Sequence, residues 1–231
     1  MEKRSVDCER QINNFQSIPN VSRWRRGYAG WSEGAVVLVT SKSEALLTTR
    51  PPFQDLHRPI LHLIPSAPAQ ILDIGAGPGH DAAAFAAMGH RVVAVEPTEQ
   101  LRLPAMALHP SPLIEWVDDS LPHLRSVAES GDTFDLVMLS AVWMHLGERQ
   151  CRTAMPVVAS VLTASGILTM SLRHGPMPSG RRTFEVTAAE TVELAKAVGL
   201  YPVINVRTDS VQLANRAAGV TWSRLAFMPS R

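Results

Sequence analysis

The sequence predicts a doubly wound α/β fold, in which a mostly parallel sheet is covered by helices on both faces. From residue 70 onward, short apolar segments alternate with segments of helical pattern, as in consecutive βαβ units. The apolar segments are apolar on both faces, which is typical of strands buried in a parallel sheet. The last two β-rich segments are instead joined by a polar loop without a crossover-length helix, so we expect them to pair as an antiparallel hairpin.

The elements follow in order along the chain. A short helix is expected at residues 53–64, before the first strand. Five strands of the parallel part are expected at residues 70–74, 91–96, 113–117, 134–140 and 166–172. Helices are expected at residues 80–89, at 99–108, where Pro104 disturbs the pattern, and at 148–162. A further helix from Thr187, its N-cap, to the stop at Gly199 leads to strands at 201–206 and 220–228. These segments make a seven-stranded sheet with a C-terminal antiparallel hairpin.

The first fifty residues differ from the rest in composition. They mix arginines, aromatic residues and glycines with poor hydrophobic periodicity, and Pro51 and Pro52 then break the chain. We therefore expect two parts, an N-terminal lid or extension over residues 1–52 and a main domain over residues 53–231.

Composition limits the classes of partner. The net charge is +1, with 45% hydrophobic and 19% charged residues, so no basic field favours nucleic acid as a partner. The two cysteines, Cys8 and Cys151, are far apart and fit a reducing compartment. The charged N-terminus lacks an apolar segment behind it, and the longest early apolar run covers only residues 35–39. We expect a cytoplasmic protein without a membrane partner, either a monomer or a homodimer.

A glycine turn directly follows the first strand, in the run "ILDIGAGPGH". Backbone N–H groups at such a strand–turn–helix junction favour anions, and glycine lets a ligand approach the chain closely. The spacing is GxGxG, and His80 stands where the dinucleotide fingerprint requires its third glycine. The GK[ST] of a P-loop is missing as well. The spacing therefore argues against a pyrophosphate ligand.

With "LDIGAGPG" and "VVAVEP" together, the chain resembles the class I S-adenosylmethionine-dependent methyltransferases, which have a Rossmann-like fold. Asp73 stands two positions before GxGxG, and Glu96 ends the second strand, as the two acidic residues of this family do. The likeness continues through "WVDDSLP", "FDLVMLSAVWMHL" and "GILTMSLRHGP", and it covers roughly residues 53–228.

The resemblance implies S-adenosylmethionine as the cofactor and assigns it a binding set. Glu96 would accept hydrogen bonds from both ribose hydroxyls, and Asp73 would orient the turn and attract the α-ammonium. Asp119, or Asp118 as the near alternative, would accept from the adenine amine, although acids in such a turn also cap the next helix. The full expected set is Asp73, Gly75, Ala76, Gly77, Glu96, Pro97, Asp118, Asp119, Ser120, Ser140 and Ala141.

Residues for the methyl acceptor are expected after the fourth and fifth strands and in the N-terminal extension. His174 is the first candidate for a general base, with hydrogen bonding to a loop as its structural alternative, and His145 is the second candidate. The expected substrate contacts are Tyr28, Trp31, Trp143 and Arg173. No Cys/His cluster has zinc spacing, so we expect no metal.

The acceptor itself stays open at the level of sequence. The segment Ser140-Ala141-Val142-Trp143 stands where amino-methylating DNA and protein-glutamine enzymes of this family carry [ND]PP[YF]. A small-molecule acceptor is therefore expected, with transfer by SN2 displacement. Two alternatives remain. One is a nucleic-acid (RNA) or protein methyltransferase that docks through Arg23–Arg26. The other is a protein that binds the cofactor without a methyl acceptor, and either uses its aminobutyryl group or serves as a sensor or scaffold.

Overall fold

In a computed structural model that describes residues 50–176 and 183–230, seven strands form one sheet in the order β3-β2-β1-β4-β5-β7-β6. The strands are β1 (Gln70–Ile74), β2 (Arg91–Val95), β3 (Ile114–Val117), β4 (Phe134–Ser140), β5 (Leu162–His174), β6 (Leu200–Asp209) and β7 (Thr221–Pro229). Strands β1 to β5 pair in parallel, whereas β7 pairs antiparallel with both β5 and β6. The predicted fold class is confirmed.

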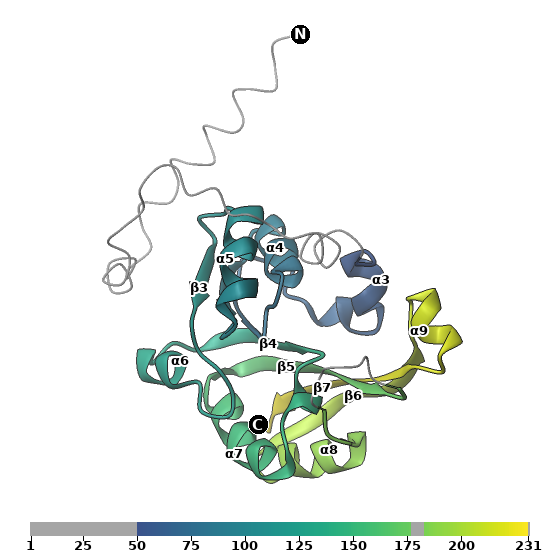
Figure 1. Ribbon diagram of the computed structural model, residues 1–231. Helices are drawn as coiled ribbons and strands as arrows, with labels where there is room; N and C mark the ends of the chain where they lie inside the picture. The colour runs from purple at the N-terminus through teal and green to yellow at the C-terminus, as the bar shows by residue number, and fades with distance from the viewer. Residues whose placement is uncertain (1–49, 177–182, 231) are drawn as a thin grey trace. The chain divides into compact units, whose positions relative to one another are not determined.

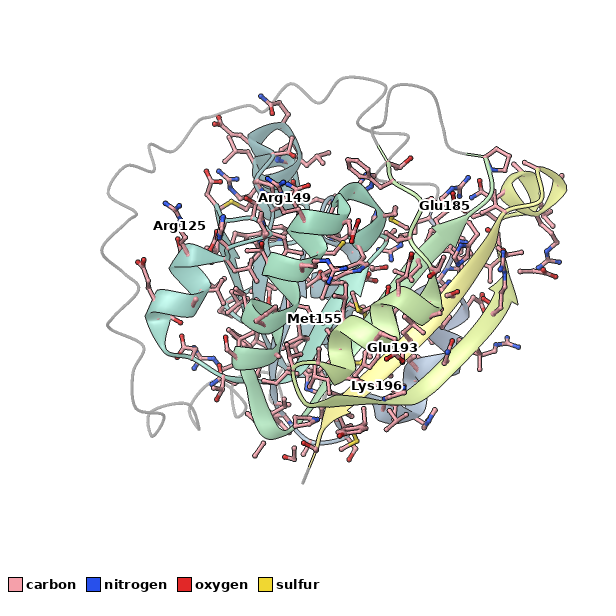
Figure 2. All side chains as sticks on the ribbon, turned by 90° about the horizontal axis from the view of Figure 1, so that it is seen from below. Arg125, Arg149, Met155, Glu185, Glu193 and Lys196 are labelled. Carbon is pink, nitrogen blue, oxygen red and sulfur yellow. The ribbon has the colours of Figure 1, made fainter. Side chains whose placement is uncertain are left out.

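Helices cover both faces of the sheet (Figure 1). One face carries α3 (Phe53–His57), the 3₁₀ helix η2 (Arg58–Leu63), α4 (His80–Ala87) and α5 (Glu99–Leu108). The opposite face carries α6 (Arg125–Ser130), α7 (Glu148–Ser160) and α8 (Ala188–Lys196). Figure 2 shows α7, with Met155, beside α8, with Glu193 and Lys196. A 3₁₀ turn, η3 (Trp143–His145), follows β4, and α9 (Leu213–Ala217) lies between β6 and β7.

Alternation along the strands divides the core into two apolar layers. In β1, Ile71 packs under α4 with Phe85, whereas its neighbour Leu72 packs on the α7 side with Met155. Both strand residues are fully buried, as expected for a strand sandwiched between helices. The same alternation puts Asp73 on the α4 side, and this side carries most of the polar groups described below.

The switch from parallel to antiparallel pairing occurs at β5. Its residue Ser171 lies opposite Ser140 of β4 on one side and opposite Arg224 of β7 on the other. Because the carboxyl ends of β1, β4 and β5 meet at one edge, loops from all three converge there.

Several local features differ from the sequence-based expectation. Strand β5 runs from Leu162 to His174, beyond the predicted range at both ends, because Leu162 pairs with Phe134 of β4 and the last residues pair with β7. Pro104 lies inside a continuous α5, whose inner side is held by buried Arg102 and Ala105. The short helices α6, α9 and η3 were not predicted, since three to six residues carry too little periodicity to recognise. Within the described ranges, no helix has the length and apolar character needed to cross a membrane.

Candidate functional site

The glycine turn after β1 is fastened to the end of β2. The N–H groups of Gly75 and Ala76 both donate to the carbonyl oxygen of Val95, at 2.8 and 2.9 Å. Gly75 and Gly77 have φ values of +70° and +54°, a region that residues with a Cβ rarely adopt. The turn therefore has a fixed, glycine-dependent conformation above the ends of two adjacent strands.

The three glycines of this turn have different surroundings. A Cβ atom at Gly75 would lie 2.6 Å from Cγ2 of Val142, and one at Gly79 would lie 2.6 Å from Cη2 of Trp116. At Gly77 the nearest atom would be the Gly75 carbonyl oxygen, 4.0 Å away. Gly75 and Gly79 thus permit close packing within the protein, whereas Gly77 leaves its outer side open to a ligand.

Glu96 links the turn to the start of the segment after β2. Its Oε2 accepts from the N–H of Gly77 at 2.9 Å, and its Oε1 accepts from the N–H of Thr98 at 2.8 Å. The side chain is buried. Because a carboxylate oxygen has two lone pairs, each oxygen can accept one further hydrogen bond. The carboxylate is therefore pre-oriented and still able to bind a diol.

Asp73 carries the clearest unmet requirement of the site. It is 2% exposed and its Oδ2 has no hydrogen-bond partner, an uncommon state for a buried polar atom. Burial, followed by the negative charge of Asp81, raises the pKa of Asp73 well above its ordinary value. A positively charged ligand group would relieve this cost, because it favours the ionised carboxylate.

Asp81, in the first turn of α4, joins the segment before β1 to the glycine turn. Its Oδ2 accepts from Nη2 of Arg50 at 2.8 Å, and its Oδ1 lies 3.0 Å from Nε2 of His57. Asp81 and His57 are buried. Although burial acts in the opposite direction, His57 and Arg50 together hold the pKa of Asp81 far below its usual range. This cluster has no local sequence motif, since Arg50 and His57 are 31 and 24 residues from Asp81, and it was therefore not predicted.

The two acidic residues after β3 have separate environments. Asp119 accepts from the N–H groups of Ser120, Ser126 and Val127, at 2.7, 2.8 and 3.2 Å. It therefore caps the N-terminus of α6. Asp118 is 66% exposed and its Oδ2 accepts from Nη2 of Arg102 at 2.8 Å. Of the two, only Asp118 keeps an oxygen without a partner among the described residues.

The loop after β4 is held against β5. The N–H of Ala141, which has a φ of +61°, donates to Oγ of Ser171 at 2.9 Å. Ser140 and Ala141 thus lie at the predicted edge of the sheet, close to Gly75 through the neighbouring Val142. Trp143, predicted as a substrate contact, is 1% exposed and packs in the apolar layer on the α7 side. This prediction is corrected, because the η3 turn directs the indole inward.

The two candidates at the end of β5 lie on opposite faces of the sheet, Arg173 on the face that carries Asp73 and His174 on the α7 face. His174 is on the same side of the sheet as Leu172, and its Nε2 lies 2.8 Å from Oγ of Ser223. Burial, then the charge of Arg207, lowers the pKa of His174 below its ordinary value. Nη2 of Arg173 donates to the Pro176 carbonyl at 2.8 Å. His145 is exposed in η3.

The other predicted site residues differ in their exposure. Ala76 is buried within the glycine turn, and Pro97 and Ser120 are exposed after β2 and β3. Residues 1–49 lie outside the described residues. They include the predicted substrate contacts Tyr28 and Trp31 and all of the predicted lid except residues 50–52. Among residues 50–176 and 183–230, no group of three His, Cys, Asp or Glu side chains could hold a metal ion.

Comparison with known families supplies the deciding observation. The family model described as "Methyltransferase domain" matches residues 71–166, from β1 into β5. Residues 71–166 are a methyltransferase domain. The sequence and the fold together are those of the class I S-adenosylmethionine-dependent methyltransferases, and S-adenosylmethionine is the cofactor of this family.

Solved structures extend the similarity beyond the matched domain. The chain is similar to 1,6-didemethyltoxoflavin-N1-methyltransferase of Burkholderia thailandensis, solved with 1,6-didemethyltoxoflavin and S-adenosylhomocysteine. The TM-score is 0.62 and the identity 25%, over 78% of this chain and 80% of that chain. No curated protein sequence matches the chain.

Two further structures share the fold of this methyltransferase domain. N-methyltransferase NodS of Bradyrhizobium japonicum WM9, in complex with S-adenosylhomocysteine, has a TM-score of 0.61 at 18% identity, over 80% of this chain and 91% of that chain. Magnesium protoporphyrin IX methyltransferase of Synechocystis PCC 6803, with bound S-adenosylmethionine, has a TM-score of 0.59 at 16% identity, over 96% and 97% of the two chains.

The residues of the site fit this cofactor. S-adenosylmethionine carries an α-ammonium, a ribose diol and an adenine amine. The unpartnered Oδ2 of Asp73 suits the ammonium, and the spare lone pairs of Glu96 suit the diol. The open side of Gly77 lies next to Glu96, so backbone and carboxylate can face the same ligand.

Proposed function

We propose that this protein transfers the methyl group of S-adenosylmethionine to a small-molecule acceptor by in-line SN2 displacement. The observation that carries the proposal is the pairing of the open glycine, Gly77, with the pre-oriented carboxylate of Glu96. When bound, the cofactor supplies a methyl group made electrophilic by its sulfonium. The protein's own residues must align the acceptor with the methyl group, exclude water and, where needed, remove a proton from the acceptor.

Binding roles follow from the contacts of each side chain. Glu96 would hold the ribose hydroxyls with the lone pairs left by Gly77 and Thr98. Asp73 would hold the α-ammonium with Oδ2. Asp118, rather than the helix cap Asp119, would accept from the adenine amine, because only its Oδ1 is unoccupied. The backbone of Ser140 and Ala141 would flank the methionine part.

A small acceptor is favoured by two features of the chain. The segment after β4 lacks the [ND]PP[YF] motif that grips a planar amide or base amine, and its Trp143 is buried in the core. The similar enzyme of Burkholderia thailandensis acts, by its name, on 1,6-didemethyltoxoflavin, which is a small molecule. The net charge of +1 gives no general attraction for nucleic acid.

His174 is the proposed proton acceptor for nucleophiles that must lose a proton. Its lowered pKa keeps the imidazole neutral at pH 7, as a base requires. Ser223 would fix the ring through its hydrogen bond to Nε2. Replacement by glutamine should lower kcat and remove the acid limb of the pH–rate profile, whereas a purely structural role would leave that limb in place.

The test is an acceptor screen with two product readouts. The full chain is incubated with methyl-labelled S-adenosylmethionine and a small-molecule library, and S-adenosylhomocysteine and methylthioadenosine are separated by chromatography. Acceptor-dependent S-adenosylhomocysteine, absent from the Glu96→Ala variant, is the expected result. Methylthioadenosine as the product would indicate transfer of the aminobutyryl group, and stimulation by RNA or protein alone would overturn the small-molecule proposal.

A further inference from the structure

Arg224 is a buried cation that the proposed reaction has not used. It lies in the middle of β7 and is 6% exposed. Its Nε has no hydrogen-bond partner, and no acceptor for the rest of its guanidinium is found among the described residues. A guanidinium has five N–H donors and stays charged in proteins. A buried one without an acceptor needs a ligand or another explanation.

The side chain lies on the face of the sheet that carries Asp73, near the loop after β4. Arg224 is directly opposite Ser171 of β5, and Ser171 accepts from the N–H of Ala141 in the loop after β4. On its own strand, the Cζ of Arg224 lies 5.2 Å from the ring centroid of Trp222. In Figure 1, β7 runs between β5 and β6, on the far side of β5 from the glycine turn.

The carboxylate that acts on Arg224 is already paired with other residues. Burial lowers the pKa of Arg224 to about 10, Asp81 raises it and Arg50 lowers it, so the guanidinium is protonated at pH 7. Asp81 is already paired with Arg50 at 2.8 Å. Because Asp81 is also 3.0 Å from His57, both of its oxygens already have partners, and a ligand carboxylate could supply the acceptor that Arg224 lacks.

We propose that Arg224 binds a carboxylate of the methyl acceptor, so that the substrates of this enzyme are small carboxylic acids. This inference rests on the proposed small-molecule methyl transfer. The planar guanidinium matches the two oxygens of a carboxylate, and the titration below compares carboxylates with phosphate directly. The cofactor's own carboxylate is the competing ligand, because Ala141, which would flank the methionine part, bonds Ser171 opposite Arg224; the experiment below therefore measures the affinity for S-adenosylhomocysteine as well.

The experiment uses full-length protein saturated with S-adenosylhomocysteine. Benzoate and acetate are titrated against their neutral counterparts benzamide and acetamide, with inorganic phosphate as a third anion. The melting temperature and the ¹⁵N–¹H resonance of the Arg224 Nε are followed. The variants are Arg224→Met, Arg224→Lys and, as the matched control, Arg152→Gln, which removes an exposed arginine paired with Glu148.

The expected result is stabilisation by carboxylates and not by amides, with a shift of the Arg224 resonance. Arg224→Met should abolish this effect, Arg224→Lys should retain part of it, and Arg152→Gln should leave it unchanged. For acceptors found in the screen, Arg224→Met should reduce kcat/KM by about 100-fold for carboxylic acids. The affinity of Arg224→Met for S-adenosylhomocysteine should stay within about twofold of the wild-type affinity, which corresponds to less than about 0.5 kcal/mol of binding free energy.

Three results would overturn the inference. Loss of S-adenosylhomocysteine affinity in a folded Arg224 variant would assign the residue to the cofactor. Phosphate binding without carboxylate binding would assign a phosphorylated acceptor. If no anion shifts the Arg224 resonance, the residue has a structural role. This result comes from the titration of the wild-type protein, so it does not depend on whether Arg224→Met folds. Failure of the proposed function is separate, since it would appear in the acceptor screen, as methylthioadenosine product or as stimulation by RNA or protein alone, and not in the anion titration.

Discussion

The N–H of Gly77 donates to Oε2 of Glu96 at 2.9 Å, which connects the glycine turn of β1 to the end of β2. One carboxylate thus holds the turn in place and remains able to bind a ligand diol. The conformation of the turn and the affinity for the cofactor therefore depend on the same side chain.

Replacement of Glu96 by alanine should weaken S-adenosylhomocysteine binding by about 100-fold, because it removes a charged acceptor and leaves two N–H groups unpaired. Titration calorimetry measures the affinity, and a thermal melt shows whether the variant is folded. Glu99→Ala, three residues further on and exposed, is the matched control. A folded Glu96→Ala variant with wild-type affinity would refute the assignment.

Substitutions of Asp118 and Asp119 should have different effects, one on cofactor binding and the other on the stability of the fold. Asp119→Ala removes the cap of α6 and should lower the free energy of unfolding by about 1 kcal/mol. Asp118→Ala should weaken S-adenosylhomocysteine binding by about tenfold, since a hydrogen bond to a charged group contributes roughly 1.5 kcal/mol. Urea unfolding and calorimetry on both variants test this. The reverse pattern would return the adenine contact to Asp119.

Asp73→Asn should stabilise the ligand-free protein at neutral pH and weaken cofactor binding. The folded-state pKa of Asp73 is raised, so its favourable contribution is present below the unfolded pKa and is lost as pH rises through the folded pKa. The melting temperature of the variant should therefore exceed that of wild type at pH 8 and match it near pH 4. Equal melting temperatures at both pH values would show that the buried carboxylate carries no such cost.

Gly79→Ala and Gly89→Ala form a matched pair. Both glycines have positive φ, +80° and +92°, but only at Gly79 would a Cβ meet a side chain, 2.6 Å from Trp116. Gly89→Ala should cost about 1 kcal/mol of unfolding free energy from backbone strain alone. Gly79→Ala should cost about 2–4 kcal/mol, because overpacking adds to that strain. Chemical denaturation measures both, and equal losses would mean that Trp116 moves freely.

Asp81 should contribute stability that disappears in acid. Its folded-state pKa is depressed by His57 and Arg50 against the effect of burial, so its contribution is present above the unfolded pKa, about 3.9, and is lost as pH falls further. Asp81→Asn should lower the unfolding free energy at pH 7 by about 3 kcal/mol. The difference from wild type should shrink below about pH 4, and a constant difference would contradict the assignment.

Much of the fold could be predicted because the strands and most helices have recognisable local sequence patterns. The strands of the parallel part are rich in apolar residues on both faces, and GxGxG with Glu96 after the second strand indicated where a cofactor would bind. The length of β5 could not be predicted, because its last residues pair with a strand 50 residues further along the chain.

The details of the site depended on contacts that leave no local signature. Trp143 stands in a segment that suggested a substrate contact, yet one 3₁₀ turn directs it into the core. Arg224 reads as an ordinary polar residue in a β-rich segment. Its importance appears only when β7 is inserted beside β5, with Asp81 and Arg50 close enough to act on its pKa. Hydrophobic periodicity along the sequence does not predict which side chains on different strands come into contact.

The position of β7 also has a consequence for synthesis. This strand follows β6 in the chain but lies between β5 and β6 in the sheet. During translation β6 therefore leaves the ribosome before β7, its partner among the described residues, and this pairing can form only after Thr221–Pro229 have emerged. The nascent chain can close its cofactor-binding half early, but Arg224 arrives only with the strand that completes the sheet.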